Sequence, residues 1–238
     1  SKRIYISPKI SDIIIRGGTD INLFDSPLLL CRNSGLSFEQ RLFKRIFDIV
    51  VSVIGLIILS PFMLIIAAAI KIDDGGSIIY KQKRLTINGK EFFVYKFRSM
   101  IPNAEKNGVP QLATGSDSRI TRVGKFLRKC RLDELPQLFN IIKGDMSVVG
   151  PRPERPELTE KYEREMPEFK FRLKVKAGLT GYAQVTGVYD TTPYDKLKMD
   201  LMYIERYSMV MDLRIILMTI KTMISPGEMN SEADKEKY

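Results

Sequence analysis

Histidine is absent from the 238 residues of this sequence, and cysteine is limited to Cys31 and Cys130. The absence of histidine excludes triads with an imidazole base, so any catalysis must depend on carboxylates, lysine, arginine, tyrosine or hydroxyl groups. The two cysteines lie far apart and outside any Cys-x-x-Cys pattern, which excludes a cysteine-ligated zinc site and is typical of a reducing compartment. The Walker A and Gly-x-Gly-x-x-Gly patterns are also missing, so the common nucleotide-binding loops are excluded.

The composition that remains is that of a folded, basic protein. Hydrophobic residues make up 44% and charged residues 28% of the chain, which argues against disorder and against a wholly membrane-embedded protein. The net charge of +10 predicts an anionic partner. Charge alone does not tell whether this partner is nucleic acid, a phospholipid headgroup or a phosphorylated substrate. The chain begins with serine and without a secretory signal, so we expect either processing or a boundary within a longer protein there.

A long apolar segment dominates the sequence. From Ile49 to Ile70 the chain has 22 residues without a charge, which as a helix of about 33 Å would reach across a bilayer. Ser60-Pro61 lies in its middle, and a proline inside a helix predicts a kink or a break. Because basic residues flank both ends and favour the cytoplasmic side, we interpret residues 46–71 as a re-entrant hairpin. A kinked transmembrane helix and a buried core helix are the alternatives.

Shorter patterns of strand and helix fill the rest of the chain. Strands are predicted at residues 4–6, 13–15, 28–30, 78–80 and 92–95, the last two forming a hairpin through Asn88-Gly89. A long polar loop covers residues 102–120. Helices are predicted at 122–131, 134–142, 158–172, 194–207 and 213–224, and the tail at 226–238 is predicted to be disordered. The fold class is therefore α+β, mostly helical with a small sheet.

Carboxylates and arginines gather between Thr121 and Pro153. Asp133-Glu134 lies at or near a predicted helix start, where the helix dipole keeps a carboxylate ionised, able to coordinate Mg²⁺ or to attack phosphorus. Helix capping is the alternative role for this pair, and the sequence alone favours it. Asp145 is a further candidate carboxylate, but capping of a turn explains its position as well as a catalytic role does.

Basic side chains suited to phosphate accompany these carboxylates. The prolines on both sides of Arg152 fix the backbone that presents its guanidinium. Lys96 and Arg98 alternate with aromatic residues, so they are expected on one strand face, as an anion site or as a solvated surface. Four further arginines flank the carboxylates in sequence: Arg119, Arg122, Arg128 and Arg131. The residues together predict a phosphate-handling site beside a membrane segment.

Six motifs, in this order along the chain, resemble those of the bacterial sugar transferase family. Members of this family are monotopic phosphoglycosyl transferases that act on polyprenyl phosphate. The motifs are Phe43-Lys44-Arg45-Ile46-Phe47-Asp48, Ser60-Pro61, Lys96-Phe97-Arg98-Ser99-Met100, Leu132-Asp133-Glu134-Leu135-Pro136-Gln137-Leu138, Gly144-Asp145-Met146-Ser147 and Val149-Gly150-Pro151-Arg152-Pro153. The resemblance implies a membrane-associated catalytic domain at 37–225 that includes the re-entrant helix broken at Ser60 and Pro61. Residues 1–36 would then end a preceding cytoplasmic domain or linker of a longer protein.

The resemblance also implies a reaction. Asp133 would attack the β-phosphate of a UDP-sugar, release UMP and carry the sugar phosphate until polyprenyl (undecaprenyl) phosphate accepts it. Glu134 would assist the acceptor step, and Mg²⁺, with Asp133 as its ligand, would neutralise the diphosphate. The phosphate-binding residues would be Lys96, Arg98, Arg128 and Arg152. Such a reaction would initiate exopolysaccharide, capsule or glycoconjugate assembly.

The location and partners follow from the same resemblance. We expect the cytoplasmic face of a bacterial inner membrane, with contacts to membrane lipid through the hairpin and through amphipathic helices such as 194–207. A homodimer is possible, and no nucleic acid is expected. Val188 stands where the family often has arginine, so a basic contact is missing there. The competing classes are a non-catalytic basic module that binds membranes or nucleic acid, and a conventional glycosyltransferase that releases UDP.

Overall fold

The computed structural model describes residues 7–23, 26–30, 35–101, 117–187 and 191–224. The α-helices are α1 (Ile10–Arg16), α2 (Phe38–Asp74), α3 (Arg122–Lys129), α4 (Gln137–Lys143), α5 (Pro156–Glu165), α6 (Tyr182–Thr186), α7 (Pro193–Glu205) and α8 (Met209–Ile224). The 3₁₀-helices are η1 (Ile87–Gly89), η2 (Leu132–Glu134) and η3 (Pro167–Lys174). The strands are β1 (Thr19–Leu23), β2 (Ser26–Leu30), β3 (Ile79–Leu85), β4 (Glu91–Phe97), β5 (Met146–Val149) and β6 (Ala177–Thr180).

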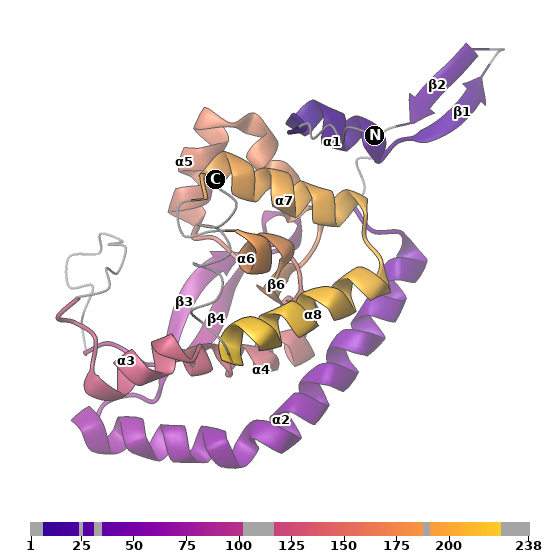
Figure 1. Ribbon diagram of the computed structural model, residues 1–238. Coiled ribbons are helices and arrows are strands. Elements are labelled where there is room, and N and C mark those ends of the chain that lie inside the picture. Colours follow the sequence, from indigo (N-terminus) through magenta and orange to yellow (C-terminus); the bar gives the residue numbers. More distant parts are fainter. Residues whose placement is uncertain (1–6, 24–25, 31–34, 102–116, 188–190, 225–238) are drawn as a thin grey trace, which may run out of the picture.

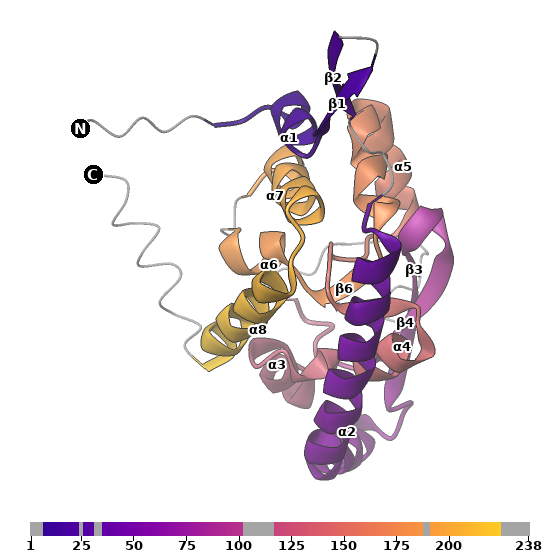
Figure 2. The same cartoon turned by 90° about the vertical axis from the view of Figure 1, so that its right-hand side faces the viewer.

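The strands form three small sheets of two strands each within the described residues. The pairs β1–β2 and β3–β4 are antiparallel, and β5–β6 is parallel. Figure 2 shows α6, α7 and α8 on one side of β6 and the β3–β4 hairpin on the other. The predicted α+β class, mostly helical with little sheet, is confirmed.

Helix α2 is defined at both ends by local signals. The Ser37 hydroxyl accepts a hydrogen bond from the Gln40 backbone N–H at 3.2 Å, and the Gln40 side chain accepts one from the Ser37 N–H at 2.9 Å, which is a capping box. The helix ends at Gly75, whose φ of 70° is the left-handed conformation that glycine adopts readily. Between these signals the helix runs for 37 residues.

The proline inside α2 kinks the helix but does not interrupt it. Pro61 has no N–H to donate to the carbonyl of Ile57, and the Ser60 hydroxyl donates to that carbonyl instead, at 3.0 Å. Figure 1 shows one ribbon that bends part-way along its length. The predicted disturbance at Pro61 is therefore confirmed as a kink, and the helix continues through it without a break.

The apolar part of α2 lies on the outside of the protein. Within the part of the chain that the structure describes, α2 is the one helix long and apolar enough to cross a membrane, and 6% of its most apolar window is buried. Its exposed side chains include Ile57, Ile58, Phe62, Leu64 and Ile65. The buried core helix considered above is therefore excluded. The re-entrant path stays a prediction.

The main core surrounds the β5–β6 pair. All four residues of β5 are buried, and the centre of the core is formed by Ile141, Met146, Val149, Leu197 and Leu201. A second, smaller cluster joins the end of α2 to β4 and α3 through Ile66, Ile70, Phe97 and Leu127. Leu132 and Leu135, on either side of Asp133 and Glu134 in the sequence, pack against the second cluster, and Leu138 belongs to the main core.

Several predicted elements take a different form. Residues 13–15 lie in α1 rather than in a strand, because Ile10 and Ile13, three residues apart, bury one helical face against α7. The helix predicted at 158–172 ends at Glu165 and gives way to η3, which begins at Pro167. Residues 28–30 form part of β2 as predicted. Residues 4–6, most of the loop 102–120 and the tail 226–238 lie outside the described residues.

The β3–β4 hairpin is confirmed in position and turn. Its register pairs Ile79 with Phe97, and the connection contains Asn88 and Gly89 with φ of 58° and 72°. Asparagine and glycine tolerate these left-handed angles better than other residues do. The hairpin places Lys96 near the end of β4, facing η2.

The apolar face of α7 is covered by protein, contrary to the prediction for residues 194–207. Leu197, Leu201 and Ile204 are buried, and α1 packs against this helix (Figure 1). Helix α8 instead exposes Val210 and Leu217, with 75% and 66% of each residue accessible. If amphipathic helices contact lipid, α8 is therefore the better candidate.

A close contact between α3 and the end of β4 gives a stability prediction. A methyl group at Gly124 would overlap the backbone carbonyl of Ser99, which cannot move without shifting the strand. We expect Gly124→Ala to destabilise the protein by about 1–3 kcal/mol despite the helix preference of alanine. Thermal unfolding in detergent would measure the loss. Gly55→Ala is the control, because its methyl would lie 3.5 Å from Leu138, an ordinary contact, and an unchanged midpoint for Gly124→Ala would contradict the prediction.

Candidate active site

Asp133 and Glu134 lie in η2, the turn that joins α3 to α4. The chain enters this turn through Arg131, the N-cap of η2, which has a left-handed φ of 54°. The N-cap of α4 is Pro136, and no side chain caps that helix. The capping role that the sequence favoured for the two carboxylates is therefore not observed.

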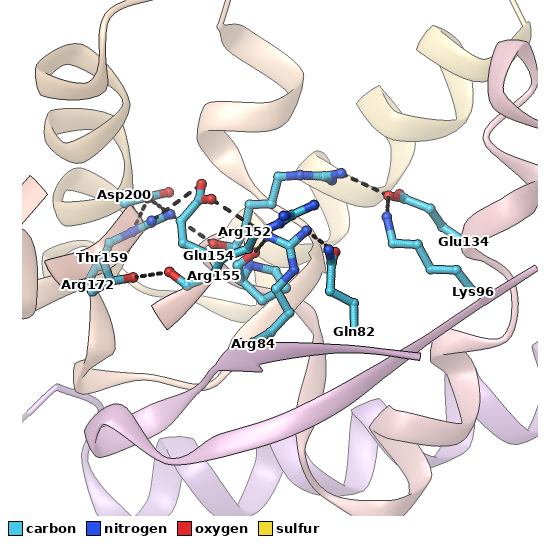
Figure 3. Close-up of polar contacts among 11 residues, drawn as sticks. Gln82, Arg84, Lys96, Glu134, Arg152, Glu154, Arg155, Thr159, Arg172 and Asp200 are labelled. Carbon is cyan, nitrogen blue, oxygen red and sulfur yellow. Dashed lines mark hydrogen bonds and ion pairs between the residues drawn. The ribbon is translucent and has the colours of Figure 1, made fainter. Parts of the chain in front are cut away.

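Glu134 is held between two basic side chains from separate elements. Its Oε1 accepts hydrogen bonds from Lys96 Nζ at 2.7 Å and from Arg152 Nη2 at 2.9 Å (Figure 3). Burial alone would raise the pKa of the Glu134 carboxyl, but the ion pairs with Arg152 and Lys96 more than offset it and hold the pKa well below its ordinary value. At neutral pH Glu134 is therefore an ionised anchor for both cations.

Asp133 has a different environment from its neighbour. No ion pair to this carboxyl is found within the described ranges of the chain. Burial, followed by repulsion from the adjacent Glu134, raises the pKa of Asp133, while Lys96 and Arg128 act in the opposite direction. The two carboxylates thus have opposite shifts, and Asp133 is the one whose oxygens remain available for a substrate or a metal ion.

The two cations that hold Glu134 differ in accessibility. The Lys96 side chain is 19% exposed and the Arg152 side chain 45%. Burial lowers the pKa of Lys96, partly offset by Glu134, and the nearby Glu134 carboxylate raises the pKa of Arg152. A half-exposed guanidinium that is already oriented beside the carboxylates is well placed to bind a phosphate oxygen.

Of the other basic residues, Arg128 lies near the site and Arg98 does not. Arg128 Nε donates to the Ser99 hydroxyl at 3.0 Å, close enough to Asp133 to affect its pKa. Arg98 forms an ion pair with Asp74 at the end of α2. Lys96 and Arg98 have different partners, Glu134 for Lys96 and Asp74 for Arg98, so the structure does not bring the two cations together in one anion-binding site.

The sequence motifs that contain Asp48 and Ser147 connect α2 to β5. Asp48 Oδ1 accepts hydrogen bonds from the Ser147 hydroxyl at 3.0 Å and from the Val148 backbone N–H at 2.9 Å. Arg45 donates to the carbonyls of Ile141 and Ile142 at the end of α4, at 2.6 and 2.7 Å. These contacts fix the first part of α2 to β5 and α4, and so fix the apolar part of α2 relative to η2.

Two of the other candidates, Arg119 and Asp145, have local contacts that explain them. Arg119 pairs with Asp117, and the Asp145 carboxylate lies 3.4 Å from Lys143 Nζ. Gly178 is packed so tightly against Gly150 that an added methyl group would overlap its backbone. This glycine therefore serves the packing of β6 against the Pro151-Arg152-Pro153 turn.

Sequence reasoning missed three residues that surround this turn, namely Arg84, Arg172 and Asp200. Arg84 comes from β3, Arg172 from η3 and Asp200 from α7, so no pattern of neighbours in the sequence connects them (Figure 3). The sequence signal that could have indicated such partners is the turn itself. Its two prolines have no backbone N–H, so the carbonyls of the turn need hydrogen-bond donors from other elements.

A magnesium ion fits this site only together with a substrate. Among the described residues no group of three or more histidine, cysteine, aspartate or glutamate side chains could form a protein cage for a metal. Glu134 is occupied by Lys96 and Arg152, which leaves the Asp133 carboxylate. Mg²⁺ is commonly held by one or two carboxylates, waters and substrate phosphates, so Asp133 and a diphosphate would suffice.

Comparison with known proteins shows which sequences this chain is similar to. The bacterial sugar transferase family matches residues 39–226. The chain is 42% identical over 185 residues to a UDP-N-acetylgalactosamine-undecaprenyl-phosphate N-acetylgalactosaminephosphotransferase of Aeromonas hydrophila, covering 76% of this chain and 44% of that protein. It is 43% identical over 211 residues to a UDP-glucose:undecaprenyl-phosphate glucose-1-phosphate transferase of Klebsiella pneumoniae, covering 87% and 43%.

A third relative is shorter. The exopolysaccharide production protein PSS of Rhizobium leguminosarum bv. phaseoli is 40% identical over 194 residues, which are 78% of this chain and 96% of that protein. The chain thus spans less than half the length of the first two relatives and nearly all of the third. The family match includes η2, Lys96, Arg152 and all of α2 except its first residue. The chain therefore belongs to the bacterial sugar transferase family.

Proposed function

We propose that this chain is the catalytic part of a phosphoglycosyl transferase that moves a sugar 1-phosphate from a UDP-sugar to undecaprenyl phosphate and releases UMP. The observation that carries the proposal is the pair of carboxylates in η2, with Glu134 held by Lys96 and Arg152 and Asp133 left available. The names of two relatives specify a UDP-sugar donor and undecaprenyl phosphate, although with different sugars. The substrate class is therefore supported, and the sugar is left open.

The first half of the reaction forms a bond to Asp133. An Asp133 oxygen attacks the β-phosphorus of the UDP-sugar, the bond from that phosphorus to the bridging oxygen breaks, and UMP leaves with this oxygen. Lys96 and Arg152 lie beside the carboxylate and would stabilise the charge that develops on the phosphoryl oxygens. In the second half, an oxygen of undecaprenyl phosphate attacks the same phosphorus and Asp133 leaves as a carboxylate.

Glu134 acts in this scheme as an orienting group. A carboxyl whose pKa is held well below its ordinary value by Arg152 and Lys96 is a poor proton acceptor at neutral pH. It instead keeps the two cations at the site between turnovers. When bound at Asp133 with the diphosphate, Mg²⁺ would supply further charge neutralisation.

We also propose that the active site lies on the cytoplasmic face of the bacterial inner membrane, with α2 inserted as a re-entrant helix. The kink at Pro61, the exposed apolar side chains of α2 and the basic residues on both sides of the apolar stretch support this topology. The polar fixation of the first part of α2 to β5 through Asp48 holds the catalytic domain close to the point where the helix would enter the lipid.

Reporter cysteines would test this topology. In a background with Cys31→Ser and Cys130→Ser, we expect Leu42→Cys and Asp73→Cys to react with an impermeant thiol reagent from the same, cytoplasmic side. Adding Pro61→Ala should straighten the helix and move the second reporter toward the opposite side, since the kink would no longer be imposed. Reaction from opposite sides before that substitution would show that α2 spans the membrane.

A release assay tests the function itself. The purified chain is incubated with a series of UDP-sugars, with and without undecaprenyl phosphate, and the nucleotide product is identified. UMP release that requires the lipid phosphate for continued turnover is expected with at least one sugar. Release of UDP would indicate a conventional glycosyltransferase. Salt-dependent binding to duplex nucleic acid without any turnover would indicate a basic binding module instead.

A further inference from the structure

Four consecutive carbonyls in the turn that presents Arg152 are each bound by a donor from another element. The carbonyl of Pro151 accepts from the Gly178 N–H at 2.9 Å, and that of Glu154 from the Leu85 N–H at 3.0 Å. The two carbonyls between them accept from arginine side chains: Arg152 O from Arg172 Nη2 at 3.0 Å, and Pro153 O from Arg84 Nη1 at 3.1 Å. Because prolines limit the backbone donors of this turn, its position depends on these external contacts.

The arginine that holds the Arg152 carbonyl is itself fixed by a buried carboxylate. Arg172 donates to Asp200 Oδ2 from Nε at 3.1 Å and from Nη2 at 2.8 Å, and the two side chains are 7% and 2% exposed. The guanidinium also lies over the Phe169 ring, 4.8 Å from its centroid, and Nη1 is 3.7 Å from Glu154. Arg172 therefore has one orientation, determined from η3, α7 and the turn together (Figure 3).

Stability alone does not account for such a pair. Removing two charges from water costs free energy that their attraction often fails to recover, so a buried ion pair is weak support for stability. Arginine is nevertheless the residue whose planar group can bind a carboxylate along one edge while donating to a carbonyl from the same nitrogen. The group that gains most from this geometry is Arg152, whose half-exposed side chain is otherwise anchored by the contact with Glu134.

We propose that Arg172, oriented by Asp200, is a positioning residue that fixes the backbone of Arg152 so that its guanidinium meets Glu134 and the substrate phosphate. The proposal rests on the proposed function for the phosphate contact, while the contact with Glu134 is independent of it. Neither Arg172 nor Asp200 touches the reacting atoms. A displacement of about 1 Å at a reacting group can cost about 100-fold in rate, so the effect on catalysis is expected to be large.

Chemical modification tests the positioning without any measurement of activity. The full chain is treated with phenylglyoxal, and reaction at each arginine is followed by peptide mass spectrometry. In Arg172→Lys, which keeps the charge beside Asp200 but loses the fork, Arg152 should react several-fold faster than in the wild type. Arg164, exposed on α5, is the internal standard. Arg45→Lys is the matched control variant, because Arg45 also donates hydrogen bonds to backbone carbonyls, but at the end of α4. It should leave the rate at which phenylglyoxal modifies Arg152 unchanged.

A double-substitution cycle tests the consequence for catalysis. We expect Arg172→Lys to reduce kcat/KM for the UDP-sugar by about 10–100-fold and to have no further effect when Arg152 is already alanine, because it acts through that residue. Losses that multiply in the double variant, or an unchanged Arg152 modification rate in Arg172→Lys, would overturn the proposal. If the wild type releases no UMP from any UDP-sugar, the proposed function fails, and the modification rate still decides the positioning.

Discussion

Replacing Asp133 with asparagine is expected to abolish formation of the covalent sugar phosphate adduct. The amide has the shape of the carboxyl but no negative oxygen to attack phosphorus. The substitution therefore removes the covalent step itself, whereas the loss of an assisting group would only slow that step. Because one positioned acid or base contributes about 10²–10⁴-fold, the loss of the nucleophile should exceed this range. Intact-protein mass spectrometry after incubation with the UDP-sugar, together with UMP release, measures both the adduct and the turnover.

The control for this variant is Asp145→Asn, which also neutralises a half-buried aspartate by an isosteric change. Asp145 follows α4 and has Lys143 as its neighbour, with no contact to the η2 carboxylates. Its variant should still form the adduct. If Asp133→Asn forms the adduct as well, or if UMP leaves only when both substrates are bound together, Asp133 is not the nucleophile, and a role as ligand to Mg²⁺ would remain.

The parts of the fold that the sequence predicted well are those with strong local signals. The uncharged run of α2 can be recognised from composition, and the Asn88-Gly89 turn from its tolerance of positive φ. By contrast, the run at residues 13–15 is too short for periodicity to separate strand from helix, and packing against α7 decided the outcome. The sequence left open whether the chain would bend or break at Pro61, and the hydrogen bond from the Ser60 hydroxyl in the continuous helix cannot be read from a hydropathy pattern.

In the candidate site, too, some residues could be predicted from the sequence and others depend on the tertiary fold. The placement of Lys96, Glu134 and Arg152 in one cluster agrees with what the ordered motifs implied. Arg98 could not be placed from strand alternation, because that rule predicts the face of the strand and not the partner, and Arg98 pairs with Asp74 at the end of α2. The pair of Arg172 and Asp200 could not be predicted either, since 28 residues separate its members and only the tertiary fold brings them together.

Replacing Glu134 with glutamine is expected to separate the two halves of the reaction. Glutamine no longer anchors Lys96 and Arg152 by charge, so continued turnover should fall by about 100-fold, the effect expected when groups at a reacting centre are misplaced. Asp133 keeps its carboxylate, so the adduct should still form, with a burst of about one UMP per protein molecule, as expected for a covalent intermediate. A rapid-quench measurement of UMP against the intact mass would detect it, and a variant without a burst would contradict this assignment.

The pH dependence of that burst gives a second, directional test. In the wild type, burial and Glu134 raise the pKa of Asp133, so attack should fail as the pH drops through a value above that of an ordinary aspartate. Glu134→Gln removes the repelling charge and leaves Lys96 and Arg152 without their counterion, and both changes lower the pKa of Asp133. The acid limb of adduct formation should therefore move to lower pH. Glu91→Gln, which alters an exposed pair with Lys83, should not move it, and a shift to higher pH in Glu134→Gln would show that Glu134 does not set the ionisation of the nucleophile.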